Sequence, residues 1–302
     1  MSKRKKKRST PKERFDLNSV IVAGTVQKLW GRGEDVFARL RVSTRRKIEE
    51  TEDKFVSYVN LRFPEGEVQG NPVSLSPGVQ VRIAGFLTHT SYHERILKFL
   101  DAAGAKNFLD GVPEEDLAAW RNINFLRRNA MLNVLGIHWI GSDVEFGKKK
   151  LAESKENNNV SLEGIVARVW QYRYKEGVHT FARLACYDRW TPIVSGVKDH
   201  FGRPRRKPHY LTVKLPDGKA GGVPVKLEKK MRVRVTGKMA DQGESVTLRE
   251  KLLDTGSEGV IQLMGRLPNA DKMGEISAQQ ASLHIEAEAL IVYSRSKERL
   301  KG

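Results

Sequence analysis

Apolar and polar residues alternate one by one along several stretches of the chain, as they do in strands with one buried face. The pattern runs through 19–30, 37–42, 58–66 and 81–85, and again through 160–170, 181–187, 210–218 and 233–237. These stretches are rich in Val, Ile, Phe and Tyr, and the turn sequences PEG and PDG end one of them in each half. Side chains in a strand alternate between two faces, so the pattern predicts four or five strands in each half.

The blocks also recur in the same order, which indicates an internal repeat. The matched pairs are SVIVAGTVQKLW (19–30) with VSLEGIVARVW (160–170), FARL (37–40) with FARL (181–184), YVNLRFPEG (58–66) with YLTVKLPDG (210–218), and VRIAG (81–85) with VRVTG (233–237). The spacing between partners grows only between blocks, as in two copies whose loops differ in length. Each copy is predicted to form a small barrel. Gly24 and Gly164 lie inside the first strand of each copy and predict a bulge or tight bend there.

Two further segments lie outside the matched blocks. Residues 113–135 have acids at the start, bases later and apolar residues at helical spacing, which predicts one amphipathic helix between the copies. Residues 148–159 are polar and are expected to be a linker. After Gly256, VIQLMGRL (260–267) and ASLHIEAEALIVY (281–293) are predicted to be strands of an appendage that serves assembly.

Charge narrows the classes of partner. The 302 residues carry 54 Lys and Arg against 36 Asp and Glu, a formal charge of +18, and residues 1–14 alone hold eight of these cations. We interpret this N-terminal block as a disordered arm, because like charges cannot bury apolar surface; it would bind phosphate, serve as an import address or only aid solubility. The excess charge favours a polyanion, with nucleic acid as the first candidate. A single cysteine, Cys186, excludes a disulfide framework and a Cys-based zinc site.

Strand alternation separates a core face from an open face. The core set is small and apolar: Ala38, Leu40, Val42, Val59, Leu61, Phe63, Val81 and Ile83, with Ala182, Leu184, Cys186, Leu211, Val213, Leu215, Val233 and Val235 in the second copy. The opposite set is aromatic, cationic and polar: Phe37, Arg39, Arg41, Tyr58, Asn60, Arg62 and Arg82, with Phe181, Arg183, Tyr187, Tyr210, Thr212, Lys214 and Arg234.

This open face has a specific use. Unpaired bases stack on aromatic rings, while guanidinium and ammonium groups neutralise the phosphates between them. The alternative is that each Phe or Tyr belongs to the core and has been assigned to the wrong face by one register step. Basic residues of the loops next to the face point the same way: Arg45 and Arg46 in the first copy, and Arg203, Arg205 and Arg206 in the second.

These residues resemble the bacterial-type single-stranded DNA-binding proteins. NSVIVAGTV (18–26) is similar to the opening of that family's OB fold, and FARLACYDRW (181–190) is similar to its second strand. The resemblance implies that Trp190 stacks on bases, and that four OB folds assemble, which two copies of this chain would supply as a homodimer. The chain departs from the family at its end, SRSKERLKG, where the family has an acidic tip that recruits partners.

The expected fold is therefore mainly β, with two OB-type five-stranded barrels in tandem and an amphipathic helix between them. The expected domains are a basic arm (1–16), OB-fold domain 1 (17–106), a helical connector and linker (107–157), OB-fold domain 2 (158–256) and a C-terminal β appendage (257–302).

The motifs argue against an enzyme. The seven histidines are scattered, with only His89 and His93 at a zinc-like spacing in an expected loop, and no phosphate-binding GxxxxGK[ST] motif occurs. We expect no cofactor. The leading hypothesis is sequence-tolerant binding of single-stranded DNA in replication, recombination or repair, with proteins of those processes as further partners, in the cytoplasm on the nucleoid or in a eukaryotic nucleus. An RNA-binding OB protein and an assembly protein that binds other proteins are the alternatives.

Overall fold

A computed structural model describes residues 15–48, 51–142, 158–174, 177–198, 202, 204–267 and 269–293. The expected basic arm, apart from its last two residues, most of the expected linker, Arg203 and the SRSKERLKG end lie outside these residues. The described part is mainly β, as expected.

The first repeat unit, copy one, contains five long strands. They are β1 (Asn18–Arg32), β2 (Asp35–Ile48), β3 (Thr51–Phe63), β6 (Val79–Arg95) and β7 (Asn124–Ser142). The small hairpin of β4 (Glu67–Val68) and β5 (Asn71–Pro72) follows the PEG turn, where Glu65 and Gly66 both have positive φ. Three short helical segments separate β6 from β7: α1 (Ile96–Ala102), η2 (Lys106–Leu109) and α2 (Glu114–Arg121).

Copy two repeats this plan. Its long strands are β8 (Asn158–Tyr174), β9 (Gly177–Cys186), β12 (His209–Leu215), β15 (Arg232–Thr247) and β16 (Ser277–Tyr293). The smaller elements are β10 (Ile193–Lys198), β11 (Pro204–Arg206), β13 (Lys219–Ala220), β14 (Val223–Pro224), α3 (Leu248–Asp254), α4 (Glu258–Gly265) and η4 (Ala270–Gly274). A capping box between Thr247 and Glu250 starts α3.

Strand pairing closes each copy and then joins the two. In copy one, β1 pairs with β2 and β6, β3 with β2 and β7, and β7 with β6, and copy two has the equivalent pairings. The copies meet where β1 runs antiparallel to β8. Val20 pairs there with Val160, its own counterpart in the repeat. The ten long strands thus belong to one large sheet that continues from one copy into the other.

Glycine allows the close strand approach that the pattern predicts. A Cβ on Gly24 would lie 2.4 Å from the backbone oxygen of Arg41, and one on Gly164 would lie 3.0 Å from that of Ala185. The β1–β2 register shifts between Val26 and Lys28, just beyond this contact, and β8–β9 shifts at the equivalent place. A register irregularity therefore lies in each first strand, a few residues after the glycine where the bulge or bend is predicted.

The predicted core residues are all buried. Every one of them is at most 1% exposed, and together they form one hydrophobic cluster that runs through both copies. The assignment of these residues to the core face is thus correct, and no register step separates it from the structure.

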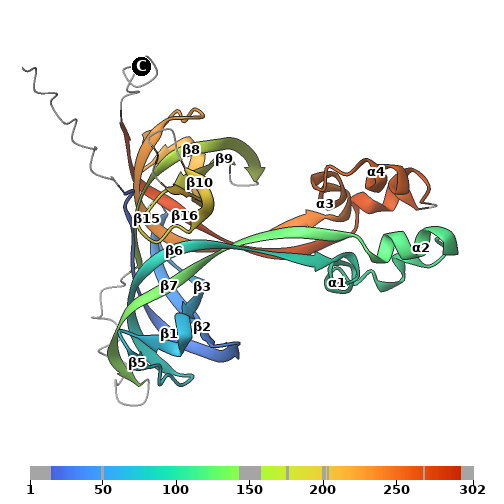
Figure 1. The fold of residues 1–302 in the computed structure, drawn as a ribbon. Coiled ribbons are helices and arrows are strands. Elements are labelled where there is room, and N and C mark those ends of the chain that lie inside the picture. Colours follow the sequence, from blue (N-terminus) through green and yellow to red (C-terminus); the bar gives the residue numbers. More distant parts are fainter. Residues whose placement is uncertain are drawn as a thin grey trace, which may run out of the picture.

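Two long hairpins leave the body and form a second core. The hairpin of β6 and β7, arm one, and the hairpin of β15 and β16, arm two, run side by side and end in helices (Figure 1). We call residues 96–123 and 248–276 together the head. Its core combines side chains from both arms, including Phe99 and Trp120 from arm one and Leu248 and Leu252 from arm two.

Two predictions of secondary structure are wrong. The predicted helix at 113–135 is helical only in α2, and the chain from Asn124 onward forms β7, because β6 offers a partner along its whole length. The predicted strand at 260–267 coincides with most of α4, whose Met264 is buried in the head core. The second strand of the expected appendage is real: it forms most of β16, which pairs with β15 and β12 of copy two.

Candidate nucleic-acid interface

The predicted open face of copy one is assembled by the pairing of β2 with β3. Phe37 lies opposite Arg62, Arg39 opposite Asn60, and Arg41 opposite Tyr58. Residues opposite each other in an antiparallel pair share a face, so these six side chains form one continuous surface. Arg41 and Tyr58 are exposed and the other four are half-buried.

Contacts within this face order its rings and cations. The Phe37 ring stacks on Trp30 of β1 at 5.7 Å between centroids, and the Arg39 guanidinium lies 5.0 Å from the centre of the Tyr58 ring. Arg62 donates to the Asp35 carboxylate at 2.7 Å, so part of its charge is already neutralised. An aromatic and cationic surface of this kind suits stacked bases and their phosphates.

The equivalent face of copy two is only partly open. Arg183 lies opposite Thr212, and Tyr210 is as exposed as Tyr58, at 39% each. Phe181 and Lys214, however, are only 3% and 6% exposed. β16 runs beside β12 here, with Glu286 next to Lys214 and the His284 ring edge-on to Phe181 at 6.2 Å. The prediction that Phe181 and Lys214 are accessible is therefore wrong, because β16 runs beside β12 and its side chains lie against both residues.

Trp190 lies at the junction of the two copies. Its ring stacks on Phe86 of β6, with 4.9 Å between centroids and 11° between planes, and the Arg189 guanidinium lies 4.6 Å from its centre. Trp190 is still 40% exposed. Tyr187 lies nearby and is 38% exposed; its partial burial and the neighbouring Tyr210 hydroxyl raise the pKa of the Tyr187 hydroxyl.

The remaining predicted cations fall into different settings. Arg82 is exposed on β6, and Arg205 is exposed on β11. Arg234, the counterpart of Arg82, is held at 2.7 Å by Glu163. Arg206 donates to the backbone oxygen of Thr191 and covers the Phe15 ring at 5.0 Å. Arg45 and Arg46 lie in β2 opposite Lys54 and Asp53, and the structure describes their backbone only.

A buried ionic network next to the junction escaped the sequence analysis. The Asp16 carboxylate accepts from Arg232 and from the backbone N–H of Tyr187, and Glu163 accepts from Arg234 and the Tyr293 hydroxyl. Burial raises the pKa of Asp16 more than these partners lower it. Burial would also raise the pKa of Glu163, but the hydrogen bonds from Tyr293 and Arg234 outweigh it and lower that pKa. No local sequence signal identifies such a network, because its members are far apart in the chain.

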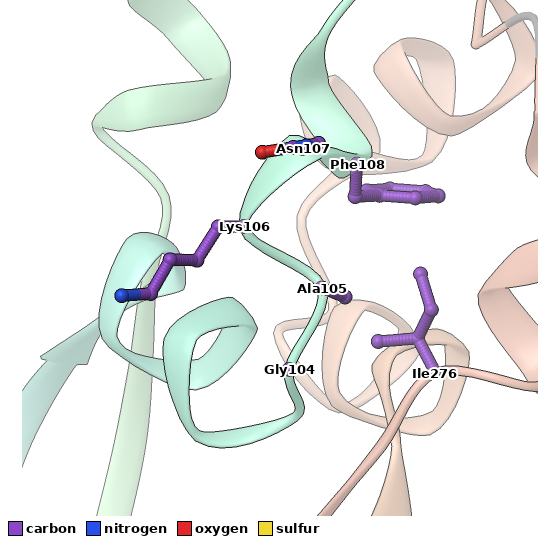
Figure 2. A pocket seen from close by; sticks show the side chains of 6 residues that line it. All are labelled: Gly104, Ala105, Lys106, Asn107, Phe108 and Ile276. Atoms are coloured by element: carbon purple, nitrogen blue, oxygen red, sulfur yellow. The ribbon is translucent and has the colours of Figure 1, made fainter.

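Other kinds of site have little support in the described residues. No group of three His, Cys, Asp or Glu within them could hold a metal ion, and none of their helices is long and apolar enough to cross a membrane. Burial raises the pKa of the Cys186 thiol, which makes it a poor nucleophile. A pocket of about 340 Å³ lies in the head, where the Phe108 ring and the Ile276 side chain lie on one side of η2 and Lys106 points away (Figure 2).

Comparisons with known proteins identify the fold alone. No family model and no curated protein matches the chain. A solved structure of a deletion mutant of the single-stranded DNA binding protein from Thermus aquaticus is similar at a TM-score of 0.50 and 12% identity, over 92% of this chain and 95% of that one. The wild-type protein gives a TM-score of 0.48 and 13% identity, over 93% and 95% of the two chains. The chain thus shares the overall fold of the first of these structures.

Proposed function

We propose that this chain is a sequence-tolerant single-stranded DNA-binding protein that acts in replication, recombination or repair. Bases would stack on the exposed tyrosines, and the arginines between them would neutralise phosphates. We further propose that each copy is an OB-type unit, with copy one at 18–142 and copy two at 158–293. A homodimer would supply four such units, and proteins of the same processes are the expected partners.

The paired face of β2 and β3 carries this proposal. It places an exposed tyrosine, a half-buried phenylalanine and three arginines on one surface, and copy two presents an equally exposed tyrosine at the matched position. A surface that served only to attract duplex DNA would need the cations but not the rings, because a duplex hides the faces of its bases. The similarity in fold to the Thermus aquaticus protein agrees with this interpretation.

A titration with oligo-dT, oligo-U and a duplex of equal length at several salt concentrations tests the proposal. We expect oligo-dT to bind more tightly than the duplex, with a salt slope near −0.7 per neutralised phosphate. Equal affinity for single strand and duplex would leave only a polycation. A clear preference for oligo-U would favour the RNA-binding alternative, and no binding to either would favour a protein-binding role.

A further inference from the structure

Each arm lies against the tyrosine-bearing strand of the other copy. Tyr58 is on β3, whose parallel pairing with β7 covers only Leu61 and Arg62. Tyr210 is on β12, whose parallel pairing with β16 covers only Val213 and Lys214. Both tyrosines therefore lie beyond the pairing on that side, where the backbone N–H of a strand needs another acceptor.

Arm one supplies an acceptor to copy two. Nδ1 of His89, on β6, accepts the backbone N–H of Tyr210 at 3.2 Å. The same imidazole lies edge-on to the Tyr210 ring, with 5.8 Å between centroids. His89 therefore contacts both the backbone and the ring of the tyrosine that copy two presents.

Arm two supplies an acceptor to copy one. The Asp241 carboxylate, on β15, accepts the backbone N–H of Tyr58, and the backbone N–H of Asp241 donates to the Ser57 hydroxyl at 3.2 Å. Burial raises the pKa of Asp241, while the nearby charge of Arg39 lowers it. Arg39 is the cation that lies over the Tyr58 ring, so Asp241 faces both groups.

The two contacts occupy the same place in the repeat. His89 and Asp241 each follow the glycine of the matched VRIAG and VRVTG blocks by four residues, and Tyr58 and Tyr210 are matched as well. We infer that the two binding faces are completed in trans: His89 of arm one positions Tyr210 of copy two, and Asp241 of arm two positions Tyr58 of copy one. The shared head core then links the two contacts, because it unites both arms. The inference rests on the proposed function, since it assigns positioning residues to the proposed site.

Crossed double-mutant cycles in the full chain test the inference. Asp241→Ala is expected to weaken oligo-dT binding by about 2- to 12-fold, the worth of one hydrogen bond, and Asp241→Asn, which keeps a carbonyl acceptor, should recover most of the loss. The effect of Asp241→Ala should be non-additive with Tyr58→Ala and additive with Tyr210→Ala. His89→Ala should show the opposite pattern. Additivity in all four pairs, or coupling within one copy, would overturn the inference.

Amide hydrogen exchange in the free protein supplies a readout that needs no nucleic acid. The Tyr58 amide should exchange faster in Asp241→Ala than in Asp241→Asn, and the Tyr210 amide should exchange faster in His89→Ala only. Unchanged exchange at both amides would also overturn the inference. If Tyr58→Ala and Tyr210→Ala leave oligo-dT binding intact while the exchange pattern is as expected, the proposed function fails and the trans contacts stand.

Discussion

Replacement of Trp190 by alanine separates a structural role of this ring from a binding role. The ring has Phe86 on one face and the Arg189 guanidinium near its centre, so an incoming base can stack on it only if Arg189 moves aside. Trp190 is 40% exposed. The buried part, roughly 100–150 Å² of a tryptophan side chain, is worth about 2–4 kcal/mol of stability.

Trp190→Ala should therefore lower the free energy of unfolding by that amount and also weaken oligo-dT binding. A lost base stack costs about 1–3 kcal/mol, which corresponds to about a 5- to 150-fold weaker affinity. Phe86→Ala is the matched control, because it removes the same intramolecular stack but leaves the tryptophan in place. It should destabilise the protein without loss of affinity.

Urea unfolding and titration with oligo-dT below the melting temperature give both quantities for each variant. The chain holds five tryptophans, so contact of the Trp190 ring with a base would appear as fluorescence quenching in the parent protein that is reduced in Trp190→Ala. If the affinity of folded Trp190→Ala equals that of the parent, Trp190 serves only to pack copy two against β6, and the assignment of this residue to the interface is refuted.

Three further predictions follow from the packing. Gly24→Ala should lower the free energy of unfolding by about 1–3 kcal/mol, because its Cβ would lie 2.4 Å from the Arg41 backbone oxygen. Gly265→Ala, at the end of α4 with no atom within 4 Å of the added Cβ, should not destabilise the protein, and equal destabilisation by both changes would contradict the close approach at Gly24. A chain that ends at Gly256 lacks β16 and should lose the cooperative unfolding of copy two; a folded, monomeric product would instead restore the appendage interpretation. Arg234→Ala should raise the pKa of Glu163. In the parent, the ionised carboxylate contributes stability above the ordinary glutamate pKa, and this stability is lost as the pH falls through the lowered pKa. In the variant the same loss of stability should occur at higher pH. Unfolding curves between about pH 3 and 6 that match those of the parent would contradict this.

Local sequence predicts this fold well where one face of a strand is buried. It predicts poorly where contact with a segment far along the chain determines whether residues form a helix or a strand. The alternation around Leu40, Leu61 and Ile83 identifies the core correctly, because each of these strands is half covered. Residues 124–135 combine apolar spacing compatible with a helix and a strand, and only the presence of β6 alongside selects the strand. The composition of VIQLMGRL predicts a strand, but its first six residues belong to α4, because Val260, Leu263 and Met264 pack at helical spacing against the head core.

The candidate site shows the same limit. The repeat predicts that Tyr58 and Tyr210 lie on the open face, and both are exposed in the structure. The burial of Phe181 and Lys214 depends on β16, which local sequence does not connect to copy two. Phe86, His89 and Asp241 come from the other copy's hairpin, so no pattern within one repeat unit indicates their contact with the proposed binding face.

The pairing of Val20 with Val160 joins two equivalent surfaces, as a twofold axis does in a homodimer, but within one chain. In a homodimer every substitution appears twice, whereas here each half can change alone. Ala23 faces Arg82 in copy one, while its counterpart Glu163 faces and neutralises Arg234 in copy two. The two halves therefore carry different charge at matched positions, which gives the proposed interface a direction of its own for a polynucleotide with distinct 5′ and 3′ ends.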